Sequence, residues 1–297
     1  MSQRILVLGA TGMLGHTLMR ELSHCPDLDV RGTALSLAGR EELFPAELVA
    51  RITTGVAASD LTGIRRLLRE TRPDAVVNCI GIIKQRPDAQ DPIQAISINA
   101  LFPHHLAREC AEVGARLIHI STDCVFSGHQ GGYTEGDLPD PSDLYGRSKL
   151  LGETVRGGSL TLRTSIIGHE LDSARSLVDW FLDQTAVRGY TKAIYSGLTT
   201  VEFARLLRTV VLPNPDLTGL FHVAATPIAK YDLLRLIATT YQWTGDIEPY
   251  DGFVCDRSLS AEALADATGY RPPAWPEMIF NLKRARDRWA DESTSPR

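Results

Sequence analysis

A tyrosine and a lysine four residues apart could move a proton to and from a bound carbonyl group. Tyr145 and Lys149 lie in a stretch with helical periodicity, so their side chains share a face and stand one turn apart. An ammonium group close to a phenol favours the phenolate, which lowers the pKa of the tyrosine toward the working pH. Thr122 ends a neighbouring predicted strand, and its hydroxyl can hold the same carbonyl oxygen. These three residues are the predicted catalytic set.

A glycine-rich turn near the N-terminus offers a place for a phosphate-bearing cofactor. Gly9, Gly12 and Gly15 stand in the stretch G-A-T-G-M-L-G, after an apolar run at residues 5–8 and at the start of an amphipathic run at residues 13–22. Glycines at this spacing allow a tight turn, a close approach of backbone to a pyrophosphate, and close packing of helix on strand. This context predicts a dinucleotide site, and a turn without a ligand is the alternative.

The end of the second predicted strand bears on the choice between NAD and NADP. An Asp or Glu there would bond the adenosine ribose hydroxyls of NAD, but residues 30–36 contain no acid. Thr33 and Arg40, with Arg31 or Ser36, could instead bond a 2′-phosphate. NADP(H) is therefore the favoured cofactor and NAD(H) the alternative. The same pattern would arise if Arg31 and Arg40 were simply solvated.

The elements that must hold these residues alternate along the first half of the chain. Short apolar runs predict strands at residues 5–8, 28–35, 75–80, 117–122 and 160–163. Stretches with helical character predict helices at residues 13–22, 61–70, 93–113 and 145–155. Strands that are apolar on both faces and separated by helices require a parallel sheet covered on both sides. The predicted fold class is α/β, a doubly wound parallel sheet of the Rossmann type.

The second half of the chain follows a looser pattern. Helices are predicted at residues 177–185, 201–211, 230–241 and 276–289, between loops that contain Pro and Gly. We expect residues 1–165 to form an NADP-binding Rossmann domain and residues 166–297 to form mainly a smaller, substrate-binding lobe over the carboxyl edge of the sheet. Parts of the second half, at about residues 199–224, could return to the main sheet.

Composition restricts the partners. The 297 residues carry 31 Lys and Arg against 36 Asp and Glu, a formal net charge of -5, and the charges are scattered. Such a chain has no general attraction to nucleic acid or anionic lipid. The apolar run at residues 5–8 is too short for a signal peptide or a membrane span, and the five cysteines lack ligand spacing. We expect a cytoplasmic protein with no nucleic-acid, membrane or metal partner.

Two motifs resemble those of the extended short-chain dehydrogenase/reductase superfamily, and within it the dTDP-4-dehydrorhamnose reductase family. The first is S-T-D-C-V-F-S-G at residues 121–128, where Cys124 replaces the tyrosine of the family's S-T-D-Y-V-F. The second is L-Y-G-R-S-K-L-L-G-E at residues 144–153, similar to the family's Y-G-K-x-K. The similarity covers roughly the first 165 residues well and the rest weakly, mainly at residues 256–259.

The resemblance implies an NADPH-dependent reduction of the 4-keto group of a nucleotide-linked 4-keto-6-deoxyhexose, in deoxysugar or polysaccharide biosynthesis. By position, Tyr145 would protonate the carbonyl oxygen while the nicotinamide delivers hydride to carbon. Lys149 would hold the nicotinamide ribose and tune Tyr145, and Thr122 would orient the substrate oxygen. The other positions that would contact or support the cofactor are Gly9, Thr11, Gly12, Met13, Leu14, Asp60, Leu61, Asn78, Ile80, Gly81 and Asn99.

The residues that would recognise the sugar are less well marked. Lys84, Asp123 and Arg257 are candidate substrate contacts, and Arg257 could clamp a diphosphate through its bidentate chemistry. The alternatives are an exposed loop lysine at Lys84 and a structural salt bridge at Arg257. The nucleotide base, the hexose and the product stereochemistry stay open, and a homodimer is compatible with the sequence.

Other functions are compatible with the same motifs. A dehydratase of the superfamily would carry Asp-Glu after the threonine, and this chain has Asp123 followed by Cys124. An epimerase would use the same catalytic set but would tend to prefer NAD. A non-catalytic NADP-binding regulatory subunit is the alternative from another class, since a regulatory subunit of methionine adenosyltransferase resembles the same reductase family. The complete set of Thr122, Tyr145 and Lys149 favours an enzyme.

Overall fold

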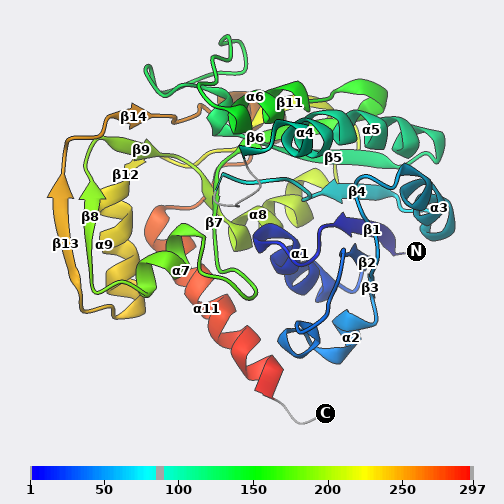
Figure 1. Ribbon diagram of the computed structural model, residues 1–297, viewed down its shortest axis with the longest axis horizontal. Helices are drawn as coiled ribbons and strands as arrows, with labels where there is room; N and C mark the ends of the chain where they lie inside the picture. The colour runs from blue at the N-terminus through cyan, green and yellow to red at the C-terminus, as the bar shows by residue number, and fades with distance from the viewer. Residues whose placement is uncertain (1, 85–89, 295–297) are drawn as a thin grey trace.

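The computed structural model, which describes residues 2–84 and 90–294, is built around a seven-stranded sheet (Figure 1). The strand order is β11-β6-β5-β4-β1-β2-β3, and every neighbouring pair is parallel. The strands are β1 (Gln3–Leu8), β2 (Leu28–Thr33), β3 (Ile52–Thr53), β4 (Ala75–Asn78), β5 (Arg116–Thr122), β6 (Leu160–Thr164) and β11 (Gly219–His222). The doubly wound α/β fold is confirmed.

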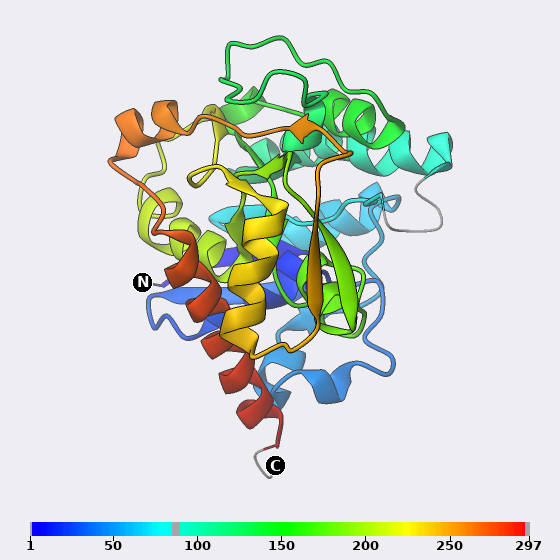
Figure 2. The ribbon, with the colours of Figure 1, turned by 90° about the vertical axis from the view of Figure 1, so that its left-hand side faces the viewer.

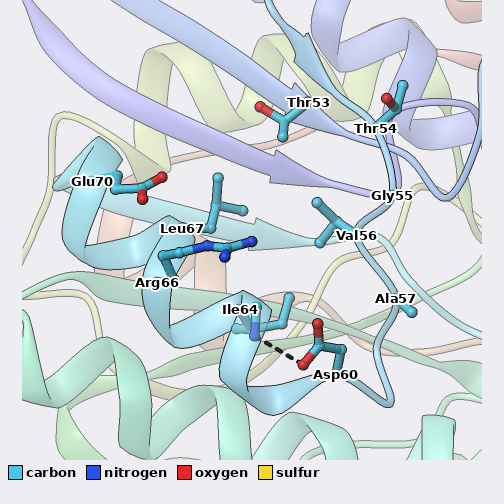
Figure 3. A pocket seen from close by; sticks show the side chains of 11 residues that line it. Thr53, Thr54, Gly55, Val56, Ala57, Asp60, Ile64, Arg66, Leu67 and Glu70 are labelled. Atoms are coloured by element: carbon cyan, nitrogen blue, oxygen red, sulfur yellow. Dashed lines mark hydrogen bonds between the residues drawn. The ribbon is translucent and has the colours of Figure 1, made fainter.

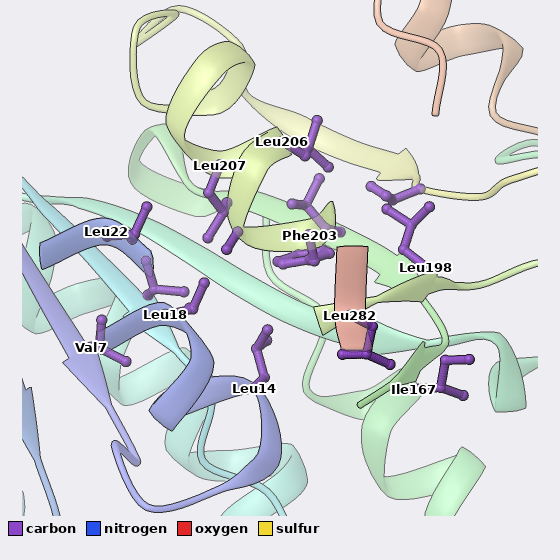
Figure 4. Close-up of a cluster of buried hydrophobic side chains, with 14 of the residues drawn as sticks. Val7, Leu14, Leu18, Leu22, Ile167, Leu198, Phe203, Leu206, Leu207 and Leu282 are labelled. Atoms are coloured by element: carbon purple, nitrogen blue, oxygen red, sulfur yellow. The ribbon is translucent and has the colours of Figure 1, made fainter. Parts of the chain in front are cut away.

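Both faces of this sheet are buried, as the apolar strands require. In β1, Ile5 and Val7 pack into one cluster, whereas Leu6 and Leu8 pack into another on the opposite face. The first cluster includes side chains of α1 (Met13–Ser23), α8 (Thr200–Leu206) and α11 (Trp275–Thr294), and Figure 4 shows part of it. The second includes side chains of α3 (Leu61–Thr71) and α5 (Phe102–Glu112). Helices from both halves of the chain therefore cover the sheet.

The predicted helix at residues 93–113 is not one regular helix. It consists of α4 (Pro92–Ala95), a wider π-helical segment η3 (Ile96–Leu101), and α5. Pro103 lacks the amide N–H that would bond the carbonyl of Asn99 in a regular α-helix, and this accounts for the irregularity. The break matters for the site, because Asn99 lies in the π-helical segment.

The second half contains short strands that were not predicted from the sequence. These strands are β7 (Ile166–Ile167), β8 (Ala186–Tyr190), β9 (Ala193–Tyr195), β10 (Leu198–Thr199), β12 (Ile228–Ala229), β13 (Asp246–Tyr250) and β14 (Cys255–Asp256). They form three small sheets beside α7 (Leu177–Leu182) and α9 (Lys230–Tyr241), on one side of the main sheet (Figures 1 and 2). Helices are present at all four predicted positions of this half, whereas the short strands were missed, because strands of two to five residues leave no periodicity to detect.

The division of the chain at residue 165 stays a prediction. β11, from the second half, pairs with β6 at the edge of the main sheet. The remaining helices of the described residues are α2 (Ala46–Val49), α6 (Leu144–Leu151), α10 (Glu262–Thr268) and a π-helical segment η6 (Leu207–Val211) that continues α8. Short 3-10 turns are η1 (Glu41–Leu43), η4 (Asp123–Val125) and η5 (Arg156–Gly158). Within the described part of the chain, no helix is both long and apolar enough to cross a membrane.

Candidate active site

A cleft of about 470 Å³ opens at the carboxyl ends of β1, β4, β5 and β6. This is the edge at which ligands bind in open α/β sheets. Ten of the residues predicted from the sequence line it: Met13, Leu14, Asn78, Ile80, Gly81, Lys84, Thr122, Asp123, Tyr145 and Lys149. The predicted catalytic set and part of the predicted cofactor set therefore face one space.

The start of α6 is fixed next to the end of β5. Asp143 caps the helix, with its carboxylate accepting a hydrogen bond of 2.8 Å from the amide of Gly146. Thr122 caps the turn η4, accepting a bond of 3.1 Å from the amide of Cys124. A Cβ atom on Gly146 would lie 2.2 Å from the carbonyl oxygen of Cys124. Glycine at this position thus lets the helix that carries Tyr145 sit directly against the strand end.

Tyr145 differs from the sequence-based expectation in the direction of its pKa. Burial raises the pKa of its phenol, and the neighbouring Cys124 and Asp123 raise it further. Thr122 opposes them by hydrogen bonding. The expected lowering of the pKa of Tyr145 was wrong, because burial and the neighbouring groups raise it. Tyr145 is therefore a neutral phenol at physiological pH, the form that can give a proton.

The side chain of Lys149 is a buried amine that makes one hydrogen bond to the described residues. It is 6% exposed, and its ammonium donates a bond of 2.7 Å to the carbonyl of Ile120. Burial lowers its pKa to about 8, although Glu153 and Cys79 act in the opposite direction. The amine therefore changes charge close to physiological pH, one helical turn from Tyr145.

The glycine turn has the geometry of a phosphate-binding turn. Gly9 adopts a φ of +84°, a conformation that side chains other than glycine rarely take. A Cβ on Gly15 would lie 2.0 Å from the carbonyl oxygen of Gly9, so helix α1 approaches the strand end as closely as backbone allows. Gly12 is the N-cap of α1 and is exposed, so no capping side chain covers the end of the helix. Thr11, the residue before it, is half-buried. The first amides of α1 are therefore open to an anionic ligand.

Thr33 and Arg40 have protein partners. Thr33 is fully buried, and its hydroxyl and carbonyl accept bonds of 3.4 and 3.1 Å from the amide of Gly9. Its hydroxyl thus supports the glycine turn. Arg40 lies in the segment after β2 and forms an ion pair of 2.5 Å with Asp172, a residue of the segment after β7. The assignment of both to a 2′-phosphate stays a prediction.

Asn78 and Asn99 hold the segment that follows β4. The Asn78 side chain accepts a bond of 3.1 Å from the amide of Ile80 and contacts the Nδ1 atom of His119 at 3.2 Å. Asn99 makes two bonds to the backbone of Ile82, at 2.8 and 3.0 Å, and donates a third to Ser148 on α6 at 3.2 Å. Both side chains are 1% exposed. They join the predicted nicotinamide end of the cleft to the catalytic helix.

Asp60 and Leu61 lie away from this cleft. Asp60 caps α3, accepting a bond of 2.9 Å from the amide of Gly63. It lines a smaller hollow of about 90 Å³, between α3 and residues 53–57, that shares no lining residue with the main cleft (Figure 3). Leu61 lines neither hollow. Their assignment to adenine stays a prediction.

The candidate substrate residues lie around Cys124. Lys84 forms an ion pair of 2.6 Å with Asp143, and its ammonium lies 5.6 Å from the centroid of the Tyr145 ring. Burial raises the pKa of the Asp123 carboxyl and, to about 11, that of the Cys124 thiol. Arg257 does not line the cleft: it donates a bond of 2.8 Å to a backbone carbonyl, and its guanidinium lies 3.9 Å from the sulfur of Cys124.

The wall contributed by the second half was missed at the sequence level. It includes Glu170, Arg175, Trp180, Tyr195 and Lys230. The hydroxyl of Tyr195 is buried and makes no hydrogen bond of acceptable geometry within the described residues. Burial raises its pKa, against a smaller opposing effect of Ser165. No motif marks these residues, because they come from separate loops and short strands. In residues 2–84 and 90–294, no three His, Cys, Asp or Glu side chains could hold a metal ion together.

Comparisons with known proteins agree with this architecture. The family model described as RmlD substrate binding domain matches residues 3–252. The beta subunit of methionine adenosyltransferase 2 from Rattus norvegicus is 32% identical over 262 residues, which cover 81% of this chain and 72% of that protein. The dTDP-4-dehydrorhamnose reductase of Streptomyces griseus is 40% identical over 151 residues, 50% of this chain and 43% of that protein.

Solved structures show the same fold. The dTDP-4-dehydrorhamnose reductase of Bacillus anthracis, in complex with NADP, superposes with a TM-score of 0.77 at 21% identity and covers 96% of this chain and 100% of that one. WbmG of Bordetella bronchiseptica, in complex with NAD and UDP, gives 0.79 at 16% identity, over 97% of this chain and 96% of that one.

The family match and the reductase relatives, together with the fold, place the protein among the extended short-chain dehydrogenases/reductases. Within that superfamily, the chain belongs to the RmlD substrate binding domain family, which includes dTDP-4-dehydrorhamnose reductases and relatives such as the methionine adenosyltransferase beta subunits.

Proposed function

We propose that this chain is an NADPH-dependent reductase of the 4-keto group of a nucleotide-linked 4-keto-6-deoxyhexose. The observation that carries the proposal is that Thr122, Tyr145 and Lys149 line one cleft together with the segments that follow β1 and β4. A space of about 470 Å³ lies in the usual range for small-molecule sites. The 40% sequence identity with the Streptomyces griseus reductase over 151 residues supports the proposal.

A dinucleotide fits the residues present. The positive φ of Gly9 and the close packing of Gly15 against Gly9 shape a tight turn at the start of α1. The open amides of that helix end would bind a pyrophosphate. Asn78 and Lys149 would hold the nicotinamide end, and NADPH would supply the hydride. The NADP and NAD that the two structural neighbours bind support a dinucleotide here, with NADP(H) favoured by the absence of an acid in residues 30–36.

The protein groups then complete the reduction. Tyr145, a neutral phenol at physiological pH, would give its proton to the carbonyl oxygen, and with hydride supplied to the carbon by NADPH the C=O bond would become CH–OH. Thr122 orients that oxygen and, by hydrogen bonding, favours the phenolate that Tyr145 becomes. The ammonium of Lys149 stabilises the same negative charge. Lys84, paired with Asp143 at the edge of the cleft, could meet the diphosphate.

The test is NADPH oxidation with dTDP-, UDP- and GDP-linked 4-keto sugars, wild type against Tyr145→Phe. The variant keeps the ring and loses only the proton, so we expect the Kd for NADPH to change less than twofold and kcat to fall by about 10²–10⁴. Full turnover by the variant would refute the role of Tyr145. Product stereochemistry, read by NMR, would separate a reductase from an epimerase, which would return a mixture of isomers without net NADPH consumption.

A second candidate is a non-catalytic NADP-binding regulatory subunit. It is favoured by the extent of the match to the methionine adenosyltransferase beta subunit, which covers 81% of this chain against 50% for the Streptomyces griseus reductase. Tight NADPH binding without turnover on any keto sugar in the panel, together with association with a methionine adenosyltransferase in sedimentation, would support this candidate and overturn the first.

A further inference from the structure

Beneath the catalytic helix lies a buried ion pair to which the proposed mechanism gives no role. Glu153 follows the end of α6 and Arg163 lies in β6. Their side chains form two hydrogen bonds of 2.8 Å and are 10% and 6% exposed. Ser121, the residue before the catalytic threonine, donates a third bond of 2.7 Å to Glu153. The carboxylate is thereby fixed in one orientation by three donors.

This carboxylate is linked to Lys149 by two routes. Glu153 follows Lys149 by four residues, as Lys149 follows Tyr145, so the three residues have the spacing of one face of α6 and its extension. The strand β5 connects them a second time, because Ile120 accepts the bond from Lys149 and the adjacent Ser121 donates the bond to Glu153. A fixed negative charge therefore stands close to a buried ammonium group.

We propose that Glu153, held by Arg163 and Ser121, is a positioning residue that keeps Lys149 protonated at physiological pH. This inference rests on the proposed function, in which the ammonium of Lys149 holds the cofactor and stabilises the phenolate. The carboxylate opposes the loss of the lysine proton that burial would otherwise cause. The other titratable groups that interact electrostatically with Lys149 are Cys79 and His119. Asp123, Cys124 and Tyr145 line the same cleft, and Arg163 is the partner of Glu153.

The test is the pH dependence of NADPH binding, followed by nicotinamide fluorescence from pH 6 to 9.5. In the wild type, the Kd should rise above pH 8 as Lys149 loses its proton. In Glu153→Gln the rise should begin at a pH lower by about half a unit or more, because one charge has been removed nearby. Glu153→Asp keeps the charge and should restore the wild-type midpoint. The basic limb of kcat/KM, measured with the 4-keto sugar of the panel that is reduced, should move in the same direction.

The matched control is Glu109→Gln. Glu109 is 5% exposed and forms the same pair of 2.8 Å bonds, to Arg65, between α5 and α3. Its loss should lower thermal stability without moving the midpoint. Because Glu153→Gln leaves Arg163 buried without its partner, the double variant Glu153→Gln/Arg163→Met is measured beside it, and we expect it to shift in the same direction.

An unchanged midpoint in both the single and the double variant would overturn the inference. A midpoint that moves equally in Glu109→Gln would overturn it too, since a general loss of stability would then explain the shift. Failure to reduce any nucleotide sugar would instead contradict the proposed function, and the NADPH titration would still report on Glu153.

Discussion

Replacing Lys149 with methionine should make the folded protein more stable at neutral pH. Burial lowers the pKa of this lysine from 10.5 to about 8, so the unfolded chain holds its proton more tightly than the folded one. Between these two values the stability of the wild type rises with pH, because the unfolded state binds more protons there. Methionine has a similar length and carries no charge, so Lys149→Met removes the cost of burying the ammonium.

The size of the effect follows from the two pKa values. The buried ammonium costs the folded state about 3 kcal/mol at pH 7 and about 1 kcal/mol at pH 9.5. The gain in unfolding free energy from Lys149→Met should therefore shrink by about 2 kcal/mol between these pH values. The lost hydrogen bond to Ile120 lowers the gain at both, and so cancels from the difference.

Urea unfolding at pH 7 and pH 9.5, for wild type and variant, measures this difference. Tyrosines with raised pKa contribute equally to both proteins and drop out of the comparison. Lys283→Met, which removes a lysine that pairs with Asp287 at the surface of α11, is the control and should not show the 2 kcal/mol change. The reasoning is refuted if wild type and Lys149→Met respond to pH in parallel, because Lys149 would then titrate alike in the folded and unfolded states.

Three further outcomes are expected. Tyr195→Phe should leave the melting temperature unchanged or raise it, whereas Tyr270→Phe, which loses a buried bond to a carboxylate, should cost about 1–2 kcal/mol; equal losses would show that Tyr195 has a partner. Gly15→Ala should cost about 2 kcal/mol or more and weaken NADPH binding, measured by chemical unfolding and calorimetry, because its Cβ would meet Gly9. Arg40→Ala should raise the Kd for NADPH more than that for NADH; a parallel change would remove Arg40 from 2′-phosphate recognition.

The first half of the fold could be predicted because its strands are buried on both faces. Such strands appear as continuous apolar runs, and the predicted runs at residues 5–8 and 117–122 differ from β1 and β5 by two residues at most. The carboxyl ends of parallel strands meet at one edge of a sheet, so the strand pattern predicts that the residues after β1, β4 and β5 lie near one another. The fold brings ten of the predicted site residues to one cleft.

The rest depends on tertiary contacts that leave no local signal. The pKa of Tyr145 is raised by burial and by Cys124 and Asp123 beside it, so the Tyr–Lys spacing alone gave the wrong direction. The hydroxyl of Thr33, which was predicted to bond a 2′-phosphate, is buried and accepts a bond from the amide of Gly9, a contact that the sequence does not indicate. The wall residues Tyr195 and Lys230 lie at the end of β9 and the start of α9, with 34 residues of sequence between them. Sequence spacing cannot indicate that both face the same ligand.

The cost of the buried charges bears on the choice between an enzyme and a binding subunit. An apolar side chain at position 149 would remove a cost of about 3 kcal/mol at pH 7, although a binding subunit would then also lose the ammonium that we propose holds the cofactor. This chain retains the ammonium, the ion pair of Glu153 and Arg163 behind it, and the buried hydroxyl of Tyr195 across the cleft. Features that cost stability and converge on one cleft are typical of sites that perform chemistry. The cost of these groups is compatible with the proposed reductase, and turnover with the panel of keto sugars decides between it and the regulatory subunit.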